Sequence, residues 1–202
     1  MKKKLRLNLG CGNRKIEGFI NIDQSDKHCK PDLVFNLEST PYPFKTSSVE
    51  YIRMSSVIEH LPSSPDDFFR ILKEFYRISE DGAIIDMWCP DPYHRFQIID
   101  FTHQRPITVE GFKLLNKQHC KKLIKDGDAA SPLALMYDID FVLESYEQLV
   151  DDECQKHIEN VLGEFDRNKI LSYYSLFNNI IQGQRIKLKV RKKIKNWQHF
   201  LV

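Results

Sequence analysis

The sequence predicts an α/β protein in which a doubly wound, mostly parallel sheet ends in an antiparallel strand. Three observations support this fold class. Short apolar segments alternate with polar residues through the first half of the chain, and the first of them runs into a glycine turn. The last strand-like segment, 185–194, follows a helical-looking stretch without an obvious parallel crossover. A length of 202 residues predicts one domain, 1–202, with a helical insertion at about 145–183.

Alternation of apolar and polar residues predicts the strands in order. The first runs from Leu5 to Leu9 and stops at Gly10, and the second runs from Phe19 to Asp23. The stretch between them is too short for a usual parallel crossover, so we expect a shortened or absent first helix. Further strands are expected over 32–37, 49–54, 83–88 and 137–143.

Capping residues predict the main helices. Residues 63–67, Ser-Ser-Pro-Asp-Asp, place a capping hydroxyl, a proline and two acids at a helix start. Apolar residues then recur at helical spacing up to Ile78, and Asp81 and Gly82 are expected to end this helix. Thr108 is expected to cap a further helix that continues through Asn116.

The final strand combines an apolar face with a basic one. Three apolar residues alternate with three basic ones over 186–191, which predicts one buried and one solvated face. Every charged residue over 185–195 is basic, whereas those over 138–166 are acidic except Lys156. The basic strand could grip phosphate or an anionic membrane, or it could be a sheet edge protected by lysines. The acidic helical insertion could pair with it within one chain or across a homodimer.

Composition excludes several classes of protein. Thirty Lys and Arg against 28 Asp and Glu give a net charge of +2, which does not favour a nucleic-acid partner. The five cysteines are scattered and never spaced as C-x-x-C, so we expect a reducing cytoplasm and no disulfide framework. The His-Cys pairs at 28–29 and 119–120 lack metal-ligand spacing, so no metal site is expected. No apolar run reaches the roughly 18 residues of a membrane span.

The glycine turn departs from two common nucleotide-binding patterns. Gly10-Cys11-Gly12 follows the first strand, where glycines allow backbone N–H groups to approach a ligand. A dinucleotide site would have a third glycine where this chain has Lys15, and its acid would come later than Asp23. The G-K-[ST] of a P-loop is also missing. A nicotinamide-dependent oxidoreductase is therefore disfavoured.

Several motifs in order resemble those of class I S-adenosylmethionine-dependent methyltransferases. They are LNLGCG at 7–12, GFINID at 18–23, DLVFNL at 32–37, SVIEHL at 56–61 and DG at 81–82. DFTHQRP at 100–106 and FNNII at 177–181 are similar to motifs of a small subgroup common among surface-glycan biosynthesis enzymes. The chain departs from that subgroup at Phe19, at Asn36 and at 81–83. The resemblance implies a Rossmann-like fold, S-adenosyl-L-methionine as cofactor and methyltransferase activity.

The resemblance also implies where the cofactor binds. A carboxylate at the end of the second strand can accept both ribose hydroxyls, and Asp23 is our candidate, although such an acid can also merely cap a turn. Asn36 and Leu37 would border the adenine, and Ser55 and Ser56 the methionine end. The expected cofactor-binding residues are Leu9, Gly10, Cys11, Gly12, Asp23, Gln24, Asn36, Leu37, Ser55 and Ser56.

The acceptor is expected to be a hydroxyl or amine of a small-molecule or glycan-like compound. The fourth strand lacks the Asn/Asp-Pro-Pro-aromatic and Pro-Cys motifs of nucleobase methylases. His103 and His60 are candidate bases because imidazole titrates near neutral pH, although each could be a structural hydrogen-bonding residue. His94, Asp100 and Arg105 are expected to bind the acceptor. The alternative function is a cofactor-binding module without transfer activity.

Overall fold

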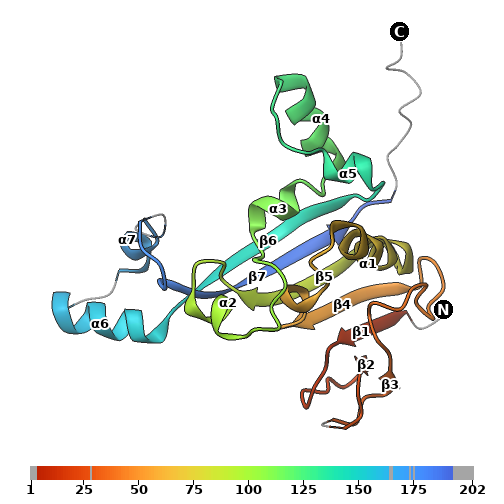
Figure 1. The fold of residues 1–202 in the computed structure, drawn as a ribbon, viewed down its shortest axis with the longest axis horizontal. Coiled ribbons are helices and arrows are strands. Elements are labelled where there is room, and N and C mark those ends of the chain that lie inside the picture. The colour runs from red at the N-terminus through yellow and green to blue at the C-terminus, as the bar shows by residue number, and fades with distance from the viewer. Residues whose placement is uncertain (1–3, 28, 164–165, 173, 175, 193–202) are drawn as a thin grey trace.

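The computed structural model describes residues 4–27, 29–163, 166–172, 174 and 176–192 and contains a seven-stranded mixed sheet. The strand order is β3-β2-β1-β4-β5-β7-β6, as Figure 1 shows. Strands β1 to β5 pair in parallel, β7 is antiparallel to β5, and β6 is antiparallel to β7. The predicted fold class, a Rossmann-like, mostly parallel sheet with an antiparallel C-terminal strand, is confirmed.

The strands are unequal in length, and the short ones lie on one side of the sheet. They are β1 (Leu5–Leu9), β2 (Ile20–Asp23), β3 (Leu33–Val34), β4 (Val49–Ser55), β5 (Ser79–Pro90), β6 (Phe141–Val150) and β7 (Ile181–Val190). In the described part of the chain, only loops join β1 to β2, β2 to β3 and β3 to β4. The prediction that the first helix would be shortened or absent is therefore confirmed.

All the helices of the described residues follow β4 in the sequence. They are η1, a 3-10 turn (Ile58–His60), α1 (Pro65–Ile78), α2 (Arg95–Ile99), α3 (Val109–Lys113), α4 (Lys117–Asp126), α5 (Leu133–Met136), α6 (Asp152–Leu162) and α7 (Arg167–Ser172). Of the helices within these described ranges, none combines the length and apolar character that a membrane span requires.

Helix α1 packs its apolar face on the sheet and forms the main core. Ser64 caps it, and Phe75 and Ile78 are fully buried against strand residues such as Ile52 and Ile85. The expected helix end at Asp81 and Gly82 is wrong: α1 ends at Ile78, and Ser79 already pairs with Val49 in the sheet. Both residues lie within β5 instead, where Gly82 supplies a positive φ of 82°.

The structure shifts several predicted boundaries. Strand β6 lies at 141–150 rather than 137–143, and β7 lies at 181–190 rather than 185–194, because the two pair antiparallel from Phe141↔Val190 to Val150↔Ile181. A register shift between Leu143 and Ser145 marks the point where the predicted strand ends, and β6 continues past it. The helical insertion therefore contains α6 and α7, between Val150 and Ile181. Thr108 does cap α3, but that helix ends at Lys113, and Asn116 caps α4 separately.

Strand β7 is an interior strand. Ile186, Leu188 and Val190 are at most 2% exposed, which confirms the predicted alternation. The interpretation of this strand as a lysine-protected sheet edge is wrong, because β7 lies between β5 and β6. Arg191 Nε donates to Asp140 at 2.7 Å, so the end of the basic strand binds an acid that precedes the helical insertion. Lys195 lies outside the described residues.

Candidate functional site

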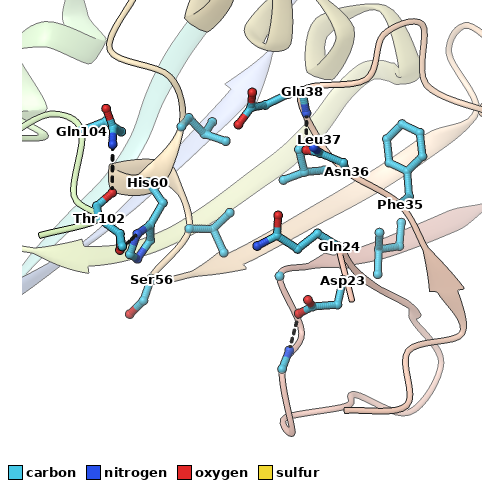
Figure 2. Close-up of a pocket in the computed structure, with 15 residues that line it drawn as sticks. Asp23, Gln24, Phe35, Asn36, Leu37, Glu38, Ser56, His60, Thr102 and Gln104 are labelled. Carbon is cyan, nitrogen blue, oxygen red and sulfur yellow. Dashed lines mark hydrogen bonds between the residues drawn. The ribbon is translucent and has the colours of Figure 1, made fainter. Parts of the chain in front are cut away.

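A cavity of about 530 Å³ opens at the carboxyl ends of the parallel strands. This is the edge of an open α/β sheet where ligands bind, and the volume is within the usual range for small-molecule sites. Figure 2 shows Asp23 and Gln24 on one side and His60, Thr102 and Gln104 on the other. The lining residues are Gly10, Gly12, Ile22, Asp23, Gln24, Phe35, Asn36, Leu37, Glu38, Ser56, Val57, His60, Leu61, Thr102 and Gln104.

The two glycines of the turn after β1 serve different purposes. Both have positive φ, 62° at Gly10 and 47° at Gly12, which L-residues with a side chain rarely adopt. A Cβ at Gly10 would lie 2.4 Å from Cγ2 of Val57, so the close approach here is to the segment after β4. A Cβ at Gly12 would have no atom within 4 Å. Gly10 therefore allows tight packing, whereas Gly12 keeps the cavity side of the turn open.

Asp23 joins the end of β2 to the glycine turn. Its Oδ2 accepts the backbone N–H of Gly12 at 2.9 Å, and its Oδ1 accepts the N–H of Ser25 at 3.3 Å. The acid thus does stabilise turns, as one interpretation of the sequence held. A carboxylate offers about four lone-pair positions, so these two bonds leave room for ligand hydroxyls.

The loop after β3 forms a second wall. The Oδ1 of Asn36 accepts the N–H of Glu38 at 2.9 Å, so this oxygen is used within the loop. Phe35, Asn36 and Leu37 all line the cavity. The charged side chains of the lining are Asp23 and Glu38, and among the described lining residues there is no Lys or Arg. The cavity is therefore suited to a ligand with positive charge and lacks a cation for a phosphate.

The two serines after β4 have different environments. Ser56, with a φ of 54°, lines the cavity. Ser55 lines a separate cavity of about 290 Å³ beside Arg53 and Arg185. The structure therefore does not bring the two serines together: Ser55 is the last residue of β4, and Ser56 follows it in a left-handed backbone conformation that turns toward the larger cavity.

His60 forms the far side of the cavity together with a segment about forty residues later in the chain. Its Nδ1 lies 2.9 Å from Oγ1 of Thr102, whose hydroxyl donates to Oδ1 of Asp100 at 2.6 Å. The backbone N–H of Gln104 donates to the carbonyl of Glu59 at 2.7 Å. These bonds bring η1 and the 100–105 segment together. Asp100 is exposed and orients Thr102 rather than lining the cavity.

His103 and Glu59 lie behind His60. The rings of His60 and His103 meet edge to face, with centroids 4.6 Å apart, and Nδ1 of His103 lies 3.0 Å from the carbonyl oxygen of Gln97. Glu59 is fully buried, and burial raises the pKa of its carboxyl to about 7. Burial, followed by the neighbouring His103, lowers the pKa of His60. Among the predicted bases only His60 contacts the cavity directly.

Four further predicted residues do not line the cavity. Leu9 at the end of β1 and Cys11 within the turn are both buried. The N–H of Cys11 donates to the carbonyl of Ile22 at 2.9 Å. His94 is buried, with Nε2 3.1 Å from Asp151, so it joins α2 to the start of α6 instead of meeting an acceptor. Arg105 stacks on Phe68 and donates to the carbonyl of Pro62. The expectation that His94 and Arg105 contact the acceptor is not met at this cavity.

Sequence reasoning missed several lining residues. Thr102 and Gln104 lie within the DFTHQRP motif, so that motif was the available signal for both. Phe35, Glu38, Val57 and Leu61 likewise lie in or beside recognised motifs. Glu59 lies within SVIEHL, directly before His60, but it is buried and does not line the cavity. Neighbours on a strand or turn can face different surroundings, so a motif identifies the segment but not the side chain that faces the ligand.

Comparisons with known proteins identify the fold. No protein-family model and no curated protein sequence matches the chain. Among solved structures, a SAM-dependent methyltransferase from Archaeoglobus fulgidus matches with a TM-score of 0.58 and 17% identity over 93% of this chain and 86% of the other. A putative S-adenosylmethionine-dependent methyltransferase from Listeria monocytogenes matches with a TM-score of 0.51 and 11% identity, over 94% and 92%. The YcgJ protein from Bacillus subtilis matches with a TM-score of 0.51 and 10% identity, over 95% of each chain. The chain therefore has the Rossmann-like fold of class I SAM-dependent methyltransferases.

Proposed function

We propose that this protein transfers a methyl group from S-adenosyl-L-methionine to a hydroxyl or amine of a small-molecule or glycan-like acceptor. The observation that carries the proposal is the bond between Asp23 and the N–H of Gly12, which sets a carboxylate against the glycine turn at the mouth of the fold's ligand site. The sequence spacing anticipated this pair, and the fold is the one that such enzymes share.

The charge of the cavity favours this cofactor over a dinucleotide. S-adenosylmethionine carries a sulfonium, an ammonium and one carboxylate, so it is net positive, and a lining whose carboxylates are Asp23 and Glu38 favours a ligand of that charge. A dinucleotide would bring two phosphates into the same space, where the described lining offers no cation. We assign the ribose to Asp23, the adenine to the wall formed by Phe35 and Leu37, and the methionine end to the glycine turn and Ser56.

The acceptor would enter beside His60. A sulfonium methyl is already activated, so in-line positioning, worth up to about 7 to 11 kcal/mol in favourable systems, can supply most of the rate enhancement. Thr102 and Gln104 form the wall on this side. His60 is the imidazole placed to receive a proton from a hydroxyl acceptor. His103 and Asp100 act through it, by packing and by orienting Thr102.

Two measurements test the proposal in sequence. Titration calorimetry should show one-to-one binding of S-adenosylhomocysteine and no comparable binding of NAD. Incubation with isotopically labelled S-adenosylmethionine and a pool of small-molecule and glycan acceptors, followed by mass spectrometry, should reveal a labelled product. Failure to bind S-adenosylhomocysteine would refute the cofactor assignment.

A cofactor-binding module without transfer activity is the second candidate. Two observations favour it: Asn36 stands where the family usually has an acid, with its Oδ1 used within the loop, and no helix joins β1 to β2 among the residues described there. Binding of S-adenosylhomocysteine with no labelled product from a broad acceptor pool would select this candidate.

A further inference from the structure

We propose that Glu59, His60 and His103 form a binding site for one divalent transition-metal ion, with Zn²⁺ as the best match, at the acceptor end of the cavity. A ligand-capable atom of each side chain lies within 4.8 Å of the other two. The binding of the ion stands on these side chains alone. Its role in activating an acceptor rests on the proposed function.

The three side chains come from two segments that the fold holds together. Glu59 and His60 belong to η1, and His103 follows α2. The backbone N–H of Gln104 donates to the carbonyl of Glu59 at 2.7 Å, and Arg105 donates to the carbonyl of Pro62. One main-chain and one side-chain hydrogen bond therefore hold the two segments beside each other. A preorganised metal site requires that its ligands be held in place in this way.

The hydrogen bonds of both histidines leave Nε2 for a metal, and the Asp100 carboxylate that faces Nε2 of His103 lies 3.9 Å away, beyond hydrogen-bond distance. Nδ1 of His103 lies 3.0 Å from a carbonyl oxygen, which can only accept, so Nδ1 carries the proton. Nδ1 of His60 lies 2.9 Å from the hydroxyl oxygen of Thr102, and that hydroxyl donates to Asp100 at 2.6 Å. Its oxygen therefore accepts from His60. Metal-ligating histidines make this kind of second hydrogen bond to a carbonyl or towards a carboxylate.

Glu59 is the observation that a purely structural pair of histidines does not explain. The residue is fully buried, and neither carboxylate oxygen has a hydrogen-bond partner. Its carboxylate lies near its own backbone N–H and that of Val57, but neither contact has hydrogen-bond geometry. A buried carboxylate without a partner is costly, and a cation bound at its oxygens would compensate that cost.

The donor set indicates which ion would bind. Two imidazoles and one carboxylate match the His₂Glu set of catalytic zinc sites, whereas Mg²⁺ prefers oxygen ligands. Ligand bonds of about 2.0 to 2.2 Å in a tetrahedron bring the ligand atoms to ~3.4 Å from one another, so the side chains would close in from their spacing of up to 4.8 Å. Because His60 lines the cavity, we expect the open fourth position to face it.

A metal ion in this position would activate a hydroxyl acceptor. Coordination lowers the pKa of the hydroxyl, and its proton leaves to water. The oxygen lone pair then forms a bond to the methyl carbon while the carbon–sulfur bond breaks and its electron pair remains on sulfur. The products are a methyl ether and S-adenosylhomocysteine. In the metal-bound protein His60 and His103 are ligands, so the acceptor's proton leaves to water and no longer to His60.

The test is Zn²⁺ binding by the full chain after treatment with a chelator, in the absence of cofactor and acceptor. Titration calorimetry should show one tight site per chain, unaffected by Mg²⁺, and Co²⁺ should give the visible absorption of a tetrahedral site. Glu59→Gln and His103→Ala should each weaken Zn²⁺ binding at least about 100-fold, because losing a ligand costs no less than losing a second-shell partner. His157→Ala, at an exposed histidine of α6, is the matched control and should bind as the unmodified chain does.

Two further measurements keep the outcomes separate. Circular dichroism establishes whether each variant folds. Thr102→Val removes the hydroxyl that links His60 to Asp100 and leaves all three proposed ligands in place. It should weaken Zn²⁺ binding about 10- to 100-fold, which keeps the site testable even if a ligand variant misfolds. Zn²⁺ binding that is absent, or is unchanged in folded Glu59→Gln, would overturn the metal site. S-adenosylhomocysteine binding measured on the same samples reports the proposed function independently, so either idea can fail while the other stands.

Discussion

The two ends of the cavity are built in different ways. At the end that we assign to the cofactor, the glycine turn follows β1 and Asp23 ends the neighbouring parallel strand β2. The N–H groups of Cys11 and Gly12 donate to the carbonyl of Ile22 and to Asp23, each at 2.9 Å. At the acceptor end, His60 meets Thr102 and His103 from a segment beyond α1, β5 and α2. The first end depends on strand register, whereas the second depends on how two distant segments pack. Variants at the two ends should therefore separate cofactor binding from methyl transfer.

The largest effect is expected at Gly10. Gly10→Val places a β-branched side chain at a φ of 62° and 2.4 Å from Val57. The left-handed backbone and the overpacking together should lower the free energy of unfolding by roughly 2 to 5 kcal/mol and abolish binding of S-adenosylhomocysteine. Urea unfolding and calorimetry measure the two effects.

A control variant in β5 separates the cost of the left-handed backbone at Gly10 from the cost of its contact with Val57. Gly82 also has a positive φ, 82°, but a Cβ there would meet no atom within 4 Å. Gly82→Ala should therefore cost only about 1 to 2 kcal/mol of stability and leave cofactor binding intact. Equal effects of the two variants would show that the contact with Val57 is unimportant.

The next largest effect is expected at Asp23. Asp23→Ala removes the carboxylate that we assign to the ribose and should weaken S-adenosylhomocysteine binding by about 2 to 4 kcal/mol, roughly 30- to 1,000-fold. The bond to Gly12 is lost as well, so the turn should loosen without unfolding the chain. Asp26→Ala, at an exposed acid nearby, is the matched control. Unchanged affinity in folded Asp23→Ala would remove this residue from the cofactor site.

His103→Ala tests the independence of the acceptor end. His103 supports His60 but does not line the cavity. Because His103 holds the ring of His60, its loss should lower methyl transfer by up to about 100-fold, the least that losing His60 itself as a base would cost, while cofactor affinity changes by less than about threefold, or ~0.7 kcal/mol. Turnover and calorimetry give the two numbers. Full turnover would make His103 structural, and a large loss of affinity would extend the cofactor site to it.

The smallest effect is expected at Asn36. Asn36→Asp restores the acid that the family usually has there and keeps an oxygen for the N–H of Glu38. A charged acceptor strengthens a hydrogen bond modestly, so cofactor affinity should rise by no more than about fivefold, or ~1 kcal/mol. Calorimetry measures the cofactor affinity of Asn36→Asp and of Asn36→Ala. The alanine variant loses both the contact with the ligand and the bond to the N–H of Glu38, whereas the aspartate variant keeps the second, so the comparison separates the two effects. A decrease in affinity with aspartate would indicate that the amide donates to the ligand.

The sequence by itself determined the parallel half of the sheet, the missing first helix and the segments that line one side of the cavity. Alternation and glycine turns are local signals, and parallel strands bring their carboxyl ends to one edge whatever else the chain does. Gly10, Gly12 and Asp23 were predicted on these grounds, Asn36 and Leu37 from the motif resemblance, and all five line one cavity.

Only the tertiary structure decided the rest. It made β7 an interior strand, directed Ser55 to another cavity and gave His94 a buried partner in Asp151. It also placed Glu59 and His103 behind His60, although forty-odd residues separate the two motifs. The surroundings of each of these residues depend on which segment, distant in the sequence, packs against it. Such contacts leave no periodic trace in a single sequence, because they are set by packing between elements rather than by the residues within one of them.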